Sequence, residues 1–97
     1  MLKVFSYGTL KDPNIQLQLF NRTIQGRSAK INNWILFTNI EGYFCITQGS
    51  DTIYGTILEL TKEEIKIADK YEEGYSRIET IAEIIDGNKE SVFVYVA

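Results

Sequence analysis

The chain has 97 residues, of which 44% are hydrophobic and 24% are charged, and its net charge is −3. These values are typical of a globular domain and argue against a disordered segment, so we expect one domain over residues 1–97. The acidic balance, with no run of basic residues, argues against binding to nucleic acid or to an anionic membrane surface. No apolar stretch is long enough to predict a transmembrane helix.

The absence of histidine restricts the chemistry that this chain can perform. It excludes a Ser-His-Asp triad and a Cys-His pair within the chain. A zinc site would need carboxylates and a single thiol, which is an unfavourable ligand set, so we expect no metal and no cofactor. Acid–base work then falls to Asp, Glu, Lys or Tyr. The single cysteine, Cys45, and the lack of a long apolar region in residues 1–5 lead us to expect a cytoplasmic location.

A strand and a helix are predicted at the start of the chain. The apolar alternation of residues 2–7 indicates a strand, which Gly8 ends. Asp12 followed by Pro13 is typical of an N-cap and a first helical position. A short helix should therefore continue to about residue 20.

A second well-patterned strand is predicted over residues 53–60, where apolar and polar side chains alternate. Gly55 inside it indicates a bend or a close approach of another backbone. Three shorter strands are predicted before it, over residues 25–32, 34–38 and 42–47, the last of them closed by a turn at residues 49–51.

The last third of the chain predicts a helix and a hairpin. Thr61 and Glu64 have the spacing of a capping box, which marks a helix start. Residues 77–85 and 91–96 are predicted strands joined by a turn at Asp86-Gly87-Asn88. Together the elements predict an α+β fold, a small mixed β-barrel-like sheet of six or seven strands flanked by two helices.

Aromatic residues in the middle of the chain are expected to pack in the core. This applies to Trp34 and Phe37, for which the wall of a pocket is the less favoured alternative. It applies also to Tyr43 and Phe44, for which the wall of a pocket is the alternative. Cys45 is expected to be a small buried hydrophobe rather than a reactive thiol.

Two motifs suggest a function. Tyr-Gly-Thr-Leu follows the first strand at residues 7–10, and Asp-x-Tyr-Glu-x-x-Tyr-x-Arg joins the last helix to the next strand at residues 69–77. With Ile-x-Gly-x-Ile at residues 53–57 between them, this order and spacing resembles the gamma-glutamylcyclotransferase-like superfamily. The resemblance extends over nearly the whole chain.

The resemblance implies a small mixed β-barrel with a pocket at one end. It implies that the loop of residues 7–10 offers backbone N–H groups to the α-carboxylate of a substrate, and that Glu72 is the general acid and base. Tyr75 and Arg77 match a Tyr-x-Arg pair beside the site. The substrate-binding residues implied in this way are Tyr7, Gly8, Thr9, Leu10, Tyr75 and Arg77.

The implied substrate is a small γ-glutamyl amine or peptide, and the implied reaction needs no nucleophile from the protein. The free α-amino group of the substrate attacks its own side-chain carbonyl and releases 5-oxoproline and an amine. Holding this geometry can contribute roughly 7–11 kcal/mol, and one carboxylate with a raised pKa can carry both proton transfers. We expect no nucleic-acid or membrane partner, and a monomer or homodimer.

Alternatives remain for the residues and for the function. Glu73 is a second candidate for the inward-facing carboxylate beside Glu72, and its charge would raise the pKa of its neighbour. Arg77 can instead pair with Glu79 or another surface acid, while Asp69 is expected to be a structural hydrogen-bond acceptor. The alternative functions are a non-catalytic module that binds small carboxylates and an interaction protein that dimerises through a barrel edge.

Overall fold

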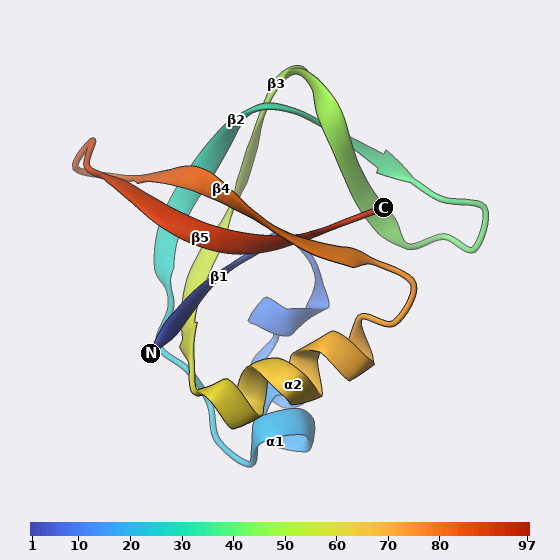
Figure 1. Ribbon diagram of the computed structural model, residues 1–97, viewed down its shortest axis with the longest axis vertical. Helices are drawn as coiled ribbons and strands as arrows, with labels where there is room; N and C mark the ends of the chain where they lie inside the picture. Colours follow the sequence, from blue (N-terminus) through green and yellow to red (C-terminus); the bar gives the residue numbers. More distant parts are fainter.

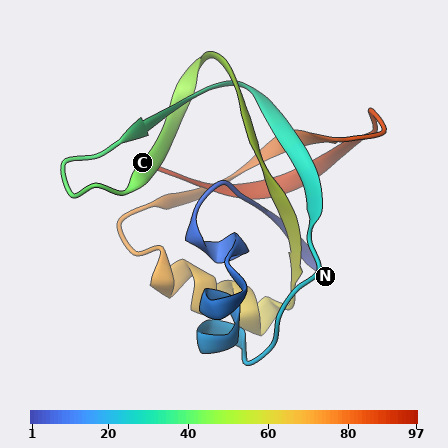
Figure 2. The same ribbon diagram turned by 180° about the vertical axis from the view of Figure 1, so that it is seen from behind.

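Five strands close into a barrel in the computed structural model, which describes residues 1–97 (Figure 1). Their order around the barrel is β1-β3-β2-β4-β5, and all neighbours are antiparallel except β1 and β5. The two helices lie together against one side of the barrel (Figures 1 and 2), which confirms the predicted α+β class. The elements are β1 (Leu2–Ser6), a 3₁₀ turn (Thr9–Lys11), α1 (Pro13–Phe20), β2 (Arg27–Thr38), β3 (Phe44–Leu60), α2 (Lys62–Tyr71), β4 (Ser76–Ile84) and β5 (Lys89–Val96).

The predicted number of six or seven strands is wrong, because β2 and β3 each unite two predicted strands. Residue Asn33, at φ 71°, lies where the register between β2 and β3 shifts. Trp34 pairs with both Gln48 and Asp51, so the glycine-containing segment between these two residues is a bulge and not a turn. A bulge bends a strand without ending it. The residues that suggested turns therefore mark irregularities within one continuous pairing of β2 with β3.

Both predicted helix starts are confirmed. The Asp12 side chain accepts a hydrogen bond from the backbone N–H of Asn14 at 2.9 Å, and Pro13 is the first residue of α1. Thr61 and Glu64 form the predicted capping box of α2. Neither helix has the length and apolar character needed to cross a membrane.

The alternation along β1 divides the core into two parts. Phe5 faces the interior of the barrel, whereas Val4 faces the layer between the barrel and the helices. Successive side chains of a strand point to opposite faces, so this one strand contributes to both. Residues of the barrel interior include Ile31, Ile46, Ile57 and Val92, and residues of the helix-facing layer include Leu58, Leu60, Ile65 and Ala68.

An ion pair fixes the start of α2 to the segment that follows α1. The Arg22 guanidinium donates to both carboxylate oxygens of Glu64, at 2.7 and 2.8 Å. Glu64 is buried, and its Oε1 also accepts from the backbone N–H of Thr61 at 2.9 Å. These bonds to Arg22, more than those within the capping box, hold the pKa of Glu64 at about 2.

Glu64→Gln should lower the free energy of unfolding by about 1–2 kcal/mol at neutral pH, because it removes the charge that pairs with a half-exposed arginine. The ion pair stabilises the fold fully above the unfolded-state pKa of Glu64. Its contribution disappears as the pH falls from about 4.5 to about 2, because the folded-state pKa is the lower one. Urea unfolding of wild type and variant should therefore differ less near pH ~3 than near pH ~7. Glu63→Gln, on the exposed face of α2, is the control, and a difference independent of pH would contradict the prediction.

Candidate functional site

A cavity of about 670 Å³ lies at one end of the barrel. Its walls come from the loop after β1, the loop between β2 and β3, and the turn between α2 and β4. Figures 1 and 2 show from opposite sides that the last two segments lie at the same edge of the molecule. The cavity thus brings together residues of both sequence motifs, namely Tyr7, Gly8, Thr9, Leu10, Glu72 and Tyr75.

Hydrogen bonds to two other elements hold the loop after β1 in place. The Tyr7 hydroxyl donates to the backbone carbonyl of Tyr95 on β5 at 2.6 Å. The buried side chain of Gln16 on α1 donates to the carbonyl of Leu10 at 2.9 Å. The chain enters its 3₁₀ turn at Thr9, and the first N–H groups of such a turn have no acceptor within it. These N–H groups can therefore donate to an anion in the cavity.

A hydroxyl pair joins the two motifs directly. The side-chain oxygens of Thr9 and Tyr71 lie 2.7 Å apart, although the residues are separated by 62 positions in the sequence. Tyr71 is the last residue of α2, and Glu72 follows it as the C-cap. The contact therefore fixes the backbone that carries Glu72 beside the loop after β1.

Glu72 and Glu73 both border the cavity, but their surroundings differ. Glu72 is half-buried and its backbone N–H still bonds to the carbonyl of Ala68 at 2.8 Å. Burial raises the pKa of Glu72 above its usual value, and no cation offsets this. Glu73 lies beyond the end of α2 and is exposed. Burial thus favours the protonated form of the Glu72 carboxyl more than solvent would.

Tyr75 closes one wall of the cavity. Its hydroxyl donates to the backbone carbonyl of Phe44 at 3.0 Å and lies 3.6 Å from the thiol of Cys45, which is buried. Burial, followed by the neighbouring Cys45 and Glu72, raises the pKa of Tyr75 to about 12. The phenol therefore keeps its proton at neutral pH and remains a hydrogen-bond donor.

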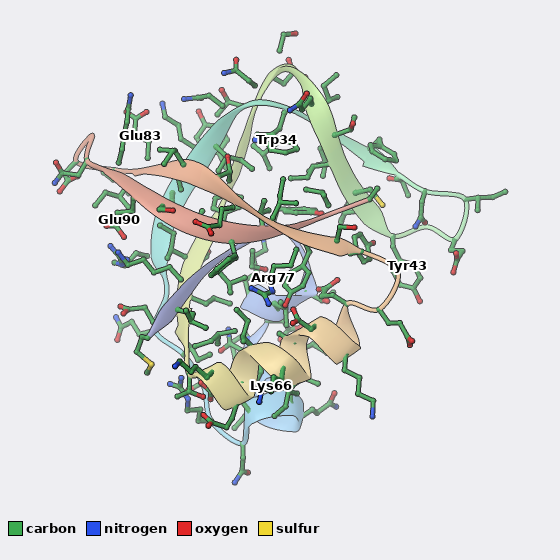
Figure 3. All side chains as sticks on the ribbon, in the orientation of Figure 1. Trp34, Tyr43, Lys66, Arg77, Glu83 and Glu90 are labelled. Atoms are coloured by element: carbon green, nitrogen blue, oxygen red, sulfur yellow. The ribbon has the colours of Figure 1, made fainter.

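Arg77 is the one implied site residue that does not border the cavity. Its guanidinium donates to both carboxylate oxygens of Asp69, at 2.8 and 3.2 Å, and lies over the ring of Phe93 at 4.6 Å. Asp69 also accepts from the hydroxyl of Tyr95 at 2.7 Å. Figure 3 shows Arg77 above α2, away from Tyr43 at the cavity edge. Burial would raise the pKa of Asp69, but these hydrogen bonds and the guanidinium charge hold it below its usual value.

Aromatic residues in and beside the loop between β2 and β3 line the cavity, although packing in the core was the preferred expectation for them. The exposed fractions of Phe37, Tyr43 and Phe44 are 39%, 62% and 55%, and all three border the cavity, which was the less favoured alternative. The available signal was the turn that separates them. Asn39 accepts the N–H groups of two loop residues through its side chain, and Gly42 adopts φ 88°, which favours glycine.

These features define a small α+β barrel protein with a half-buried carboxylate and a glycine loop in one end cavity. The chain belongs to the family described as gamma-glutamyl cyclotransferase, AIG2-like, whose model matches residues 4–97. This confirms the family that the two motifs resemble. A comparison with curated proteins found no match.

Solved structures share the fold at low sequence identity. A protein of Arabidopsis thaliana superimposes with a TM-score of 0.89 at 25% identity, over 98% of this chain and 67% of its own. A gamma-glutamyl cyclotransferase gives 0.86 at 17% identity, over 98% and 65% of the two chains. An AIG2-like protein from Mus musculus gives 0.83 at 19% identity, over 100% and 77%. The chain thus spans about two thirds to three quarters of the length of these relatives.

Proposed function

We propose that the chain is a cyclotransferase that cleaves a γ-glutamyl amine or peptide and releases 5-oxoproline and a free amine. One observation carries the proposal: the half-buried Glu72 borders the same cavity as the loop of residues 7–10, and the Thr9–Tyr71 contact holds the two together. Family membership over residues 4–97 supports the same class of reaction.

In this proposal the loop binds the α-carboxylate of the substrate. Backbone N–H groups of Gly8, Thr9 and Leu10 at the start of the 3₁₀ turn supply the donors, so no cationic side chain is required. Tyr7 anchors the loop through its bond to Tyr95. Fixing the carboxylate places the α-amino group of the substrate within reach of its own γ-carbonyl carbon.

Glu72 moves the protons. Its ionised form accepts a proton from the α-amino nitrogen as that nitrogen attacks the γ-carbonyl carbon. Its protonated form then donates to the amide nitrogen as the carbon–nitrogen bond breaks and the amine departs. A carboxyl whose pKa is raised by burial suits both steps, because it accepts the first proton more readily than an exposed carboxylate does and can then donate it.

Arg77 and Tyr75 have different parts in the proposal. Tyr75 remains a candidate contact for the substrate, since its protonated phenol borders the cavity. Arg77 was expected to bind substrate, but its ion pair with Asp69 favours a positioning role, because Asp69 lies on α2 and also bonds to Tyr95 of β5. The pair thereby ties the helix that carries Glu72 to the barrel.

The test is release of 5-oxoproline by the purified protein from a set of γ-glutamyl amines and γ-glutamyl peptides. We expect 5-oxoproline and free amine in equal amounts. Formation of glutamate in place of 5-oxoproline would indicate hydrolysis by water and contradict the proposal. Thermal stabilisation by 5-oxoproline with no turnover of any substrate would favour the binding module instead.

A further inference from the structure

The cavity has a second wall that the proposed chemistry does not use. It is formed by Glu41 and Tyr43 of the loop between β2 and β3 and by Phe44, the first residue of β3. If the loop after β1 binds the glutamyl part of a substrate and Glu72 the reacting nitrogens, this wall faces the amine that departs. In that arrangement the residues of this wall would contact the leaving amine.

The charged side chains around the cavity have a single sign. Glu41, Glu72 and Glu73 border it, whereas no lysine or arginine does. With Glu72 engaged in proton transfer, Glu41 and Glu73 remain beside the leaving amine. A leaving group that carries a carboxylate would meet these acids without a compensating cation, which is unfavourable in a partly desolvated site.

The loop that carries Glu41 is held in one conformation. The side-chain oxygen of Asn39 accepts from the backbone N–H groups of Glu41 and Tyr43, both at 3.0 Å. The backbone N–H of Asn39 donates to the Tyr43 carbonyl at 2.9 Å, and Gly42 donates back to Asn39 at 2.9 Å. Glu41 thus lies in a turn whose backbone is held by hydrogen bonds within residues 39–43.

Glu41 borders the cavity close enough to Tyr75 for its charge to act on the phenol. The negative charges of Glu72 and Glu41 both act on the phenol of Tyr75, whose hydroxyl bonds to the Phe44 carbonyl. Figure 3 shows Tyr43 at the same edge, beside the turn that follows α2. The exposed aromatic faces of Tyr43 and Phe44 add to this wall a surface that attracts cations.

We propose that Glu41, with Tyr43 and Phe44, forms a subsite that selects leaving amines bearing a second positive charge, such as the distal ammonium of a diamine. This inference rests on the proposed cyclotransfer and specifies its substrate class. Peptides whose leaving group ends in a carboxylate are the disfavoured class.

Three γ-glutamyl amides of matched length test the subsite: those of putrescine, pentylamine and γ-aminobutyrate. They place an ammonium, a methyl group and a carboxylate at the same distance from the scissile bond. Release of 5-oxoproline should show kcat/KM about tenfold higher for the putrescine amide than for the pentylamine amide, with the γ-aminobutyrate amide lowest. Added salt should reduce the preference, because the charges are partly exposed.

Glu41→Gln should remove most of the advantage of the putrescine amide over the pentylamine amide, and Glu41→Lys should raise the rate on the γ-aminobutyrate amide above that on the putrescine amide. Glu63→Gln, which removes an exposed acid of α2, is the matched control and should keep the wild-type order. Equal wild-type rates on the putrescine and pentylamine amides, or a preference of unchanged size in Glu41→Gln, would overturn the subsite while leaving cyclotransfer intact. Absence of 5-oxoproline from all three amides would overturn both proposals.

Discussion

Glu72→Gln should lower the rate of 5-oxoproline release by about 10²–10⁴-fold, the contribution expected of a positioned general acid and base. The amide has nearly the shape of the carboxyl group, so the cavity keeps its form, but it neither accepts nor donates the proton that the reaction moves. The measurement is kcat with a γ-glutamyl amine at saturation. A variant with full activity would contradict the assignment of Glu72.

The wild-type rate should also depend on pH in a defined direction. Since Glu72 must be ionised to accept the first proton, activity should decrease as the pH falls through its folded-state pKa. Burial raises this pKa, so the decrease should begin above the usual carboxyl range. A pH profile of kcat/KM measures it, and the residual activity of Glu72→Gln should lack this limb.

Thermal unfolding of Glu72→Gln tests whether its loss of activity comes from the missing acid–base group or from a destabilised fold. Because the folded state raises the pKa of Glu72, ionising this group costs stability, and the cost grows as the pH rises from the usual carboxyl range through the folded-state value. Near neutral pH, Glu72→Gln should therefore be at least as stable as the wild type. Glu73→Gln is the matched control and should keep most of the activity. Loss of activity in Glu73→Gln together with full activity in Glu72→Gln would assign the catalytic role to Glu73.

Gly55→Ala should lower the free energy of unfolding by about 3 kcal/mol, at the upper end of what overpacking costs. A Cβ at position 55 would clash with the backbone carbonyl of Ser6 and lie 2.7 Å from Cζ of Phe5. Since a domain of this size is stable by about 5–15 kcal/mol, this is a large share of its stability. Urea unfolding at neutral pH measures the change.

Gly8→Ala is the control for this substitution, because nothing lies within 4 Å of a Cβ at position 8. It should leave the free energy of unfolding nearly unchanged. The steric clash in Gly55→Ala pushes on Ser6, directly before the loop after β1, so binding of 5-oxoproline should weaken as well. Equal unfolding midpoints for Gly55→Ala and Gly8→Ala would show that β1 moves aside without cost.

Local elements of this fold are determined by the sequence itself. The N-cap at Asp12, the capping box of Thr61 and Glu64, and the hairpin turn at Gly87 all form as the sequence predicts. Each depends on hydrogen bonds or backbone angles within a few residues of the chain. Such interactions can be predicted from neighbouring residues without knowledge of the rest of the fold.

Part of the candidate site can also be predicted from the sequence. The motifs at residues 7–10 and 69–77 identify the family and indicate Glu72 as the acid–base residue. They do not decide whether Glu72 or Glu73 faces the cavity. The end of α2 at Tyr71 makes Glu72 the C-cap and leaves Glu73 exposed. A shift of one residue at a helix end turns a side chain by about 100° (3.6 residues per turn), so only the folded helix separates the two.

Tertiary structure alone decided the number of strands, the partner of Arg77 and the second wall of the cavity. β2 and β3 continue through their irregular residues because each pairs along the other for most of its length. Arg77 meets Asp69 across the turn between α2 and β4. Phe37, Tyr43 and Phe44 border the cavity because closure of the barrel brings the loop between β2 and β3, and the strand ends beside it, next to that turn. These contacts join residues that are distant in sequence or separated by a turn, and a linear pattern contains no information about which of them meet.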